Sequence, residues 1–207
     1  MMEKPHLEFL VEEPSMEAFL HELLPRLFPE DCPSFRVHAF QDKLDMLDKL
    51  QARLKGYSYW PSNYGRIVVM VDCDDDDCHK LKQRLEKAAT IAGLSTRSGS
   101  GGHLWQVVNR IVIEELEAWY FGDWKAVKSA YPRVSPTVPN RAPYRNPDAI
   151  KGGTWEAFER ILQNGGYFKN GLRKVEVART IAAHINPDCN RSHSFVQFCD
   201  ALIEAMA

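Results

Sequence analysis

The segment RIVVMVDCDDDD, residues 66–77, constrains the fold more than any other part of the chain. Its apolar residues, Ile67–Val71, are followed by five acids within the six residues that begin at Asp72. A short aliphatic run bounded by polar residues is typical of a strand that is buried on both faces, as in the centre of a parallel sheet. The segment therefore predicts a central parallel strand that ends in a cluster of carboxylates.

The first 123 residues repeat this pattern of a strand followed by a helix. The predicted strands are His6–Glu12, Phe35–Phe40, Arg66–Asp72 and Trp105–Ile113. Each is followed by apolar residues at helical spacing, for example Leu44, Leu47, Leu50 and Leu54 after the second strand. Four such alternations predict an α/β fold with a layered, mostly parallel sheet and helices on both faces.

The character of the chain changes near Asp123. Five prolines fall within residues 132–147, which disfavours regular structure there. Helical spacing of apolar residues resumes after Gly153. We therefore predict an α/β domain over residues 1–123, and a proline-rich connection with a helical appendage over residues 124–207.

Composition limits the cellular setting and the choice of partner. The formal net charge is −2, so the chain has no global basic field that would attract nucleic acid. Such a partner would require a local basic patch, a metal ion or a companion protein. The five cysteines are odd in number and scattered, and the sequence has neither a signal-peptide pattern nor a membrane-spanning apolar stretch. We expect a cytoplasmic protein that does not enter a membrane.

Acidic residues follow two of the predicted strands. The carboxyl ends of parallel strands meet at the edge where open α/β sheets bind ligands. Asp72 and Asp74, two residues apart on an extended chain, are expected to point the same way and to share one divalent cation. Glu12 ends the first strand at the same edge, whereas Glu13 is expected to point to the opposite side of the chain.

A purely structural interpretation applies to part of the acidic run. Asp76 and Asp77 precede a predicted helix, where they would act as caps and favour its positive end. Asp72 is different because it ends the strand itself. Oxygen ligands without histidine or cysteine suit Mg²⁺ or Mn²⁺ better than zinc.

Two segments make the sequence similar to a known family. VEEPSMEAFL, residues 11–20, resembles the first motif of the Toprim fold, and the strand that ends in Asp72-x-Asp74 resembles the second. Toprim is the catalytic fold of topoisomerases, primases and the OLD (overcoming lysogenization defect) nucleases. A closer resemblance is to a family of small bacterial Toprim-like proteins of unknown function, whose later E-x-E-A-W signature matches Glu115 and Glu117. The resemblance covers roughly residues 6–125.

The resemblance implies a set of site residues. Glu12, Asp72 and Asp74 correspond to the Toprim glutamate and metal-binding pair, and Glu115 and Glu117 to additional acids of the OLD-like sites.

Lys43 would be the catalytic lysine, which could steady phosphate charge. The sequence departs from the family pattern at Glu13, where glycine is usual, and at Asp42, where related sequences read Gly-Lys. An isolated lysine at the start of a helix is more often solvated, so the departure at Asp42 leaves the role of Lys43 open.

The implied activity is that of an Mg²⁺- or Mn²⁺-dependent nuclease acting on DNA or RNA. The family resemblance further implies anti-phage defence with an ABC-type ATPase as partner protein, and it leaves self-association as a homo-oligomer open. Basic residues of the C-terminal segment, among them Lys174, could form a nucleic-acid patch, although solvated faces are commoner.

Two alternatives come from other classes of protein. One is a non-catalytic or regulatory partner subunit that uses the acidic pocket only to bind a metal. The other is a receiver-like switch domain, which would need a lysine near the last strand that this chain does not offer.

Overall fold

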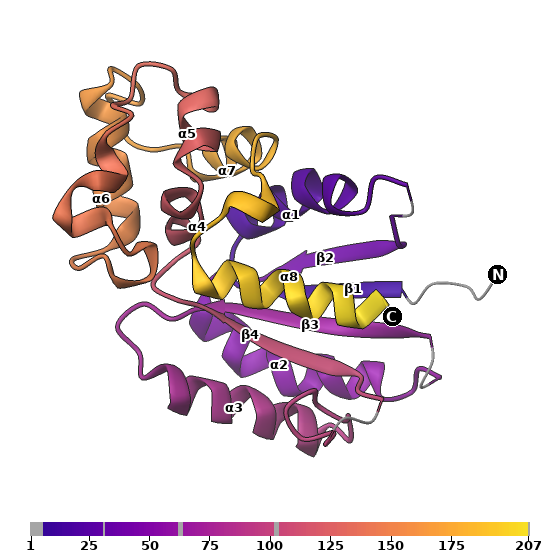
Figure 1. Cartoon of the computed structure of the whole chain (residues 1–207). Coiled ribbons are helices and arrows are strands. Elements are labelled where there is room, and N and C mark those ends of the chain that lie inside the picture. Colours follow the sequence, from indigo (N-terminus) through magenta and orange to yellow (C-terminus); the bar gives the residue numbers. More distant parts are fainter. Residues whose placement is uncertain (1–5, 31, 62–63, 102–103, 207) are drawn as a thin grey trace.

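The computed structural model describes residues 6–30, 32–61, 64–101 and 104–206, and it has the predicted layered α/β fold (Figure 1). The strands are β1 (His6–Val11), β2 (Phe35–Ala39), β3 (Gly65–Asp72) and β4 (Val107–Val112). The helices between and after them are α1 (Pro14–Leu27), α2 (Lys43–Tyr57), α3 (Cys78–Ile91), α4 (Glu117–Gly122), α5 (Trp124–Ala130), α6 (Thr154–Asn164), α7 (Lys174–Ala182) and α8 (His193–Met206). Short 3₁₀ helices are η1 (Val138–Asn140), η2 (Ala142–Tyr144), η3 (Pro147–Ala149) and η4 (Pro187–Cys189).

The sheet is parallel throughout, with the strand order β2-β1-β3-β4. β3 is central, as predicted, because it pairs with β1 on one side and β4 on the other. Val68 lies in register with Phe9 of β1 and with Val108 of β4. All five residues of the apolar run, Ile67–Val71, are buried.

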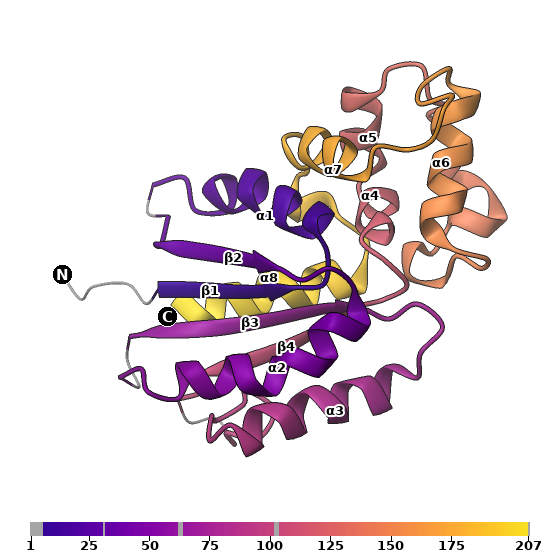
Figure 2. The same ribbon diagram turned by 180° about the vertical axis from the view of Figure 1, so that it is seen from behind.

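Helices cover both faces of the sheet, as predicted (Figure 2). α2 and α3 pack on the face that carries Ile67, Val69 and Val71. α1 and α8 pack on the face that carries Val68 and Met70. Each fully buried aliphatic side chain contributes roughly 1.5–3 kcal/mol of transfer free energy, so both faces add to the stability of the sheet.

The C-terminal segment is helical after its prolines, as predicted. The prolines lie among short 3₁₀ helices rather than in an irregular coil, because proline is tolerated at the first positions of a helical turn. α7 packs against α1, and α8 returns to cover β4 (Figure 1). One hydrophobic cluster therefore includes residues from the sheet and from these helices. The boundary at residue 123 stays a prediction.

No helix in the described ranges combines the length and the apolar character that a membrane crossing requires. The predicted cytoplasmic location stays a prediction.

Candidate functional site

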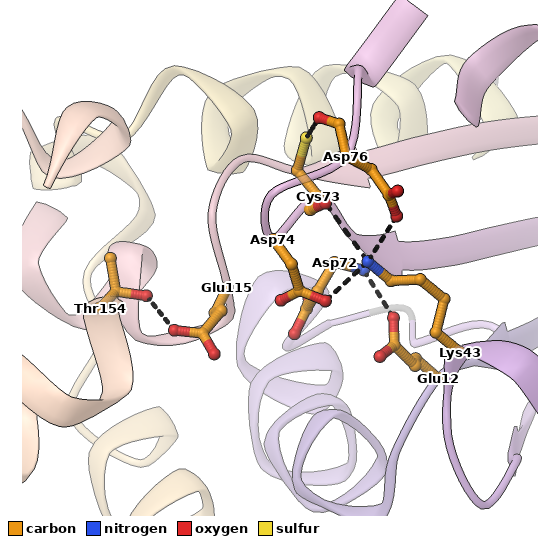
Figure 3. A network of polar contacts seen from close by, with 8 residues as sticks. All are labelled: Glu12, Lys43, Asp72, Cys73, Asp74, Asp76, Glu115 and Thr154. Carbon is orange, nitrogen blue, oxygen red and sulfur yellow. Dashed lines mark hydrogen bonds and ion pairs between the residues drawn. The ribbon is translucent and has the colours of Figure 1, made fainter. Parts of the chain in front are cut away.

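Glu12 and Asp72 lie side by side at the carboxyl edge of the sheet. β1 ends at Val11 and its neighbour β3 ends at Asp72, so the two acids leave adjacent strands. Oε2 of Glu12 accepts a hydrogen bond from the backbone N–H of Asp72 at 3.0 Å (Figure 3). Two acids that are 60 residues apart in the sequence therefore meet at the predicted place.

The carboxylate of Asp72 is buried among other acids. Only 7% of the residue is exposed. Burial raises the pKa of Asp72 well above its ordinary value, and the charges of Glu12, Glu13, Glu117 and Asp74 raise it further. An ionised carboxylate in such surroundings would be stabilised by a cation.

Glu12 titrates near neutral pH for similar reasons. Burial raises the pKa of Glu12 to about 7, and the charges of Asp74 and Glu13 add to the effect. The Asp72 N–H and the Lys43 ammonium oppose it only in part. The side chain can therefore gain or lose a proton close to pH 7.

Lys43 holds a positive charge in front of the acids. It is the first residue of α2, and its Nζ lies 2.6 Å from Oδ2 of Asp74, 3.0 Å from Oδ2 of Asp76 and 3.2 Å from the carbonyl oxygen of Cys73 (Figure 3). Burial alone would lower the pKa of Lys43, but Asp74, Asp76 and Glu12 outweigh it and raise the pKa. Three oxygens at the end of β3 thus already hold a cation.

The prediction that Asp74 points the same way as Asp72 assumed an extended chain, and the chain is not extended at Asp74. β3 ends at Asp72, and Asp74 adopts a left-handed conformation with φ +47°. Its backbone N–H donates to the carbonyl oxygen of Glu114 at 2.9 Å, so the chain turns and strand alternation no longer applies. Asp72 is consequently buried, whereas 46% of the Asp74 side chain is exposed and faces Lys43.

The last two residues of the acidic run, Asp76 and Asp77, have different roles. Asp77 caps α3, because its side chain accepts hydrogen bonds from the N–H groups of His79 and Lys80, as predicted. Asp76 was expected to be a cap as well, but it binds Lys43 instead. The turn after β3 directs Asp76 toward α2 before α3 begins.

Glu13 contacts Lys174 rather than the Asp72 backbone, and the prediction that it points to the opposite side of the chain stays a prediction. Its carboxylate accepts a hydrogen bond from Oγ of Ser15 and lies 3.7 Å from Nζ of Lys174. The prediction assumed continued strand alternation, but the strand ends at Val11 and Glu13 is already the residue before α1.

Glu117 is a further buried acid close to Asp72 and Glu13. It is the first residue of α4 and is 2% exposed. Burial raises the pKa of Glu117 to about 8, Lys174 opposes the shift, and Glu115 and Glu13 add to it. The Tyr120 hydroxyl is buried nearby and has no hydrogen-bond partner within the described residues. Burial and the charges of Glu117, Glu13 and Asp72 raise the pKa of Tyr120.

Glu115 has a different environment. It precedes α4, which begins at Glu117. Its Oε2 accepts hydrogen bonds from Oγ1 of Thr154 at 2.7 Å and from the N–H of Trp155 at 2.9 Å, at the start of α6 (Figure 3). The observed contacts are those of a helix N-terminal acceptor, and its role as a metal ligand stays a prediction.

Lys174 belongs to the site although sequence reasoning singled it out only as one of several basic residues. It begins α7, lies 3.7 Å from Glu13, and its Nζ sits 5.2 Å from the centre of the Trp155 ring. Burial would lower the pKa of Lys174, but Glu117, Glu13 and other nearby acids raise it. No local motif marks this lysine, because only the packing of α7 on α1 brings it to the acids.

We use the name acid site for five carboxylates, Glu12, Glu13, Asp72, Asp74 and Glu117. Within the described part of the chain, no group of three or more histidine, cysteine, aspartate or glutamate side chains is arranged to hold a metal ion. The donor chemistry nevertheless fits a hard divalent cation, because the groups are carboxylate and carbonyl oxygens and the Lys43 ammonium is already held among them. Ion binding would require the side chains to converge and Asp74 to exchange Lys43 for the ion.

The fold and the site define an α/β protein with an acidic pocket at the carboxyl edge of a parallel sheet. A family model matches residues 11–203, and the chain belongs to that family, which is described as a domain of unknown function (DUF4276). No curated protein and no solved structure shows significant similarity to the chain. The family match includes β2, β3, β4 and the C-terminal helices, and it begins at the last residue of β1. The resemblance to Toprim proteins stays a prediction.

Proposed function

We propose that the protein is a divalent-metal-dependent phosphodiesterase of the Toprim type that cleaves nucleic acid. The observation that carries the proposal is the burial of the Asp72 carboxylate among acids from separate segments, with Glu12 bound to its backbone N–H. Such crowding of anions opposes folding unless a cation compensates it. Its position at a ligand-binding sheet edge favours a functional explanation.

The residues would divide the work as follows. Glu12, Asp72 and Asp74 would hold Mg²⁺ or Mn²⁺. When bound, such an ion polarises a phosphodiester and makes its bound water more acidic. Burial raises the pKa of Glu12 to about 7 without the ion, and the bound ion would lower it again and keep Glu12 ionised as a ligand near neutral pH. Lys43, once released from Asp74, can approach a phosphate oxygen.

A second candidate is a non-catalytic partner subunit. The ion pairs of Lys43 with Asp74 and Asp76 favour it, because they occupy the lysine that catalysis would need at a phosphate oxygen. On the family resemblance alone, we also propose that either form works with an ABC-type ATPase in anti-phage defence.

The test is a cleavage assay with DNA, RNA and tRNA in the presence of Mg²⁺ or Mn²⁺. Wild type is compared with Asp72→Asn and with Asp75→Asn, a matched control that removes the same charge from an exposed neighbour. We expect Asp72→Asn to slow cleavage by about 10³-fold, since a bound metal supplies several kcal/mol of transition-state stabilisation. Asp75→Asn should cleave at close to the wild-type rate.

Equal cleavage by wild type and Asp72→Asn, or cleavage that survives chelation, would refute the proposal. A wild type that binds metal but cleaves none of the substrates would favour the non-catalytic partner instead.

A further inference from the structure

A basic groove runs along the outer edge of β4, between α3 and α8. Its volume is about 230 Å³, several times the ~30 Å³ that one water occupies in the liquid. His79 and Lys82 of α3, Arg110 of β4 and His193 of α8 are among its lining residues. None of the described residues that line it is an aspartate or a glutamate. We call it the β4 groove.

The β4 groove adjoins the acid site through the chain itself. Its lining residue Cys78 directly follows the acidic run, and its lining residue Ile113 directly precedes Glu114. The hydrogen bond from the Asp74 N–H to the Glu114 carbonyl ties these two loops together at 2.9 Å. α3 and α8 both begin at the end of the sheet where β3 and β4 end (Figure 1).

The two inner cations of the β4 groove, Arg110 and Lys82, are partly buried, and Arg110 is the less compensated of the two. Burial lowers the pKa of Arg110, and the charge of Arg97 lowers it further against the attraction of Glu204 and other acids. Its Nε is buried without a hydrogen-bond partner in the described ranges. Burial likewise lowers the pKa of Lys82, although Glu86 pairs with it at 2.9 Å. An anion in the groove would stabilise both cations.

The edge of β4 adds backbone donors to these cations. β4 bonds to β3 through alternate residues, as in the 2.8 Å hydrogen bond from the Cys73 N–H to the Val112 carbonyl. The intervening residues direct their backbone groups outward, and Nζ of Lys82 accordingly donates to the carbonyl oxygen of Asn109. Asn109 and Ile111 both line the groove, and their backbone N–H groups face away from β3.

We propose that the β4 groove binds a backbone phosphate of the nucleic-acid strand next to the one at the acid site. The inference rests on the proposed function. It adds that the nucleic-acid strand runs from the acid site along the β4 groove. It also explains how a chain with a net charge of −2 and an acidic pocket can hold a polyanion. A local array of cations supplies the attraction that the whole molecule lacks.

The experiment measures binding in EDTA, so that it does not depend on cleavage. Fluorescence anisotropy follows labelled single-stranded DNA, duplex DNA and RNA as they bind wild type, Arg110→Gln, Lys82→Gln and the double variant. Lys87→Gln is the matched control, because it removes the same charge from an exposed position of α3 outside the groove. Arg110→Lys keeps the charge, and thermal unfolding checks that each variant is folded.

We expect each groove substitution to weaken binding about 5- to 10-fold and to reduce the slope of log K against log salt by roughly one. Arg110→Lys should retain most of the affinity, and Lys87→Gln should bind like wild type. Groove variants that bind like Lys87→Gln, or a wild type that binds none of the three nucleic acids, would overturn the proposal.

The two proposals can fail separately. Cleavage by wild type together with unchanged binding by the groove variants would overturn the β4 groove and leave the proposed function standing. Binding lost in the groove variants without any cleavage by wild type would overturn the proposed function and leave the groove standing.

Discussion

Two buried carboxylates of the sheet, Glu8 and Asp72, have opposite surroundings. Glu8 of β1 is 4% exposed, and its oxygens lie 2.8 Å from Nε2 of His6, 2.7 Å from Nε2 of His38 and 2.9 Å from the hydroxyl of Tyr57. Burial alone would raise the pKa of Glu8, but these three hydrogen bonds outweigh it and lower the pKa. At Asp72, burial and neighbouring acids act together and raise the pKa.

The difference distinguishes a carboxylate with a structural role, Glu8, from one for which we propose a functional role, Asp72. The partners of Glu8 belong to the chain, so its charge is compensated whenever the protein is folded. The charge of Asp72 is surrounded mainly by further carboxylates, so a bound cation would stabilise it. Burial by itself is therefore a poor guide to function, and the sign of the charge around a buried acid is a better one.

The largest expected effect on stability is that of Glu8→Gln. The substitution removes charge-assisted hydrogen bonds from a buried network, so we expect a loss of about 3 kcal/mol in the free energy of unfolding, measured in urea. Because the folded pKa of Glu8 is lowered, its contribution is complete above the unfolded value of 4.5 and is lost as the pH falls through the folded value. Glu30→Gln, at an exposed position, is the control. If Glu8→Gln is as stable as wild type, Glu8 does not have the stabilising role that distinguishes it from Asp72.

Glu117→Gln should act in the opposite direction. The folded pKa of Glu117 is about 8 and its ordinary value is 4.5, so the unfolded chain releases the proton first as the pH rises. Wild-type stability should therefore decline between pH 4.5 and 8. The variant lacks this decline and should be more stable than wild type by the order of 2 kcal/mol at pH 8, with little difference at pH 4.5. Unfolding curves at both pH values check this, and a variant that is less stable at pH 8 contradicts it.

Glu115→Gln should change the free energy of unfolding least among these three substitutions. If the carboxylate serves mainly as an acceptor at the start of α6, the variant should lose about 1 kcal/mol of stability and keep its cleavage rate. Loss of cleavage without loss of stability would instead support the predicted role as a metal ligand.

Much of the fold follows from local patterns in the sequence. All four strands lie where apolar runs were found, because a strand in a covered parallel sheet must be apolar along its length. Glu12 and Asp72 could be placed together for the same reason, since parallel strands end at one edge.

The parts of the site that the sequence did not predict depend on other physics. The positions of Glu13 and Asp74 depend on turns directly after the strands, and the left-handed conformation of Asp74 has no signal in an acidic run. Lys174 reaches Glu13 from about 160 positions later in the chain, through packing of α7 on α1. Contacts of this kind come from tertiary packing and leave no periodic pattern.

The most direct test of the central claim is a titration with Mn²⁺, followed by calorimetry and by electron paramagnetic resonance. Wild type is compared with Asp72→Asn and with Glu8→Gln, which alter the two buried carboxylates. We predict that wild type binds the ion, that Asp72→Asn weakens binding by at least about 10-fold, and that Glu8→Gln, where it is folded, binds like wild type. Absence of binding by wild type, or equal affinity in wild type and Asp72→Asn, would contradict the account.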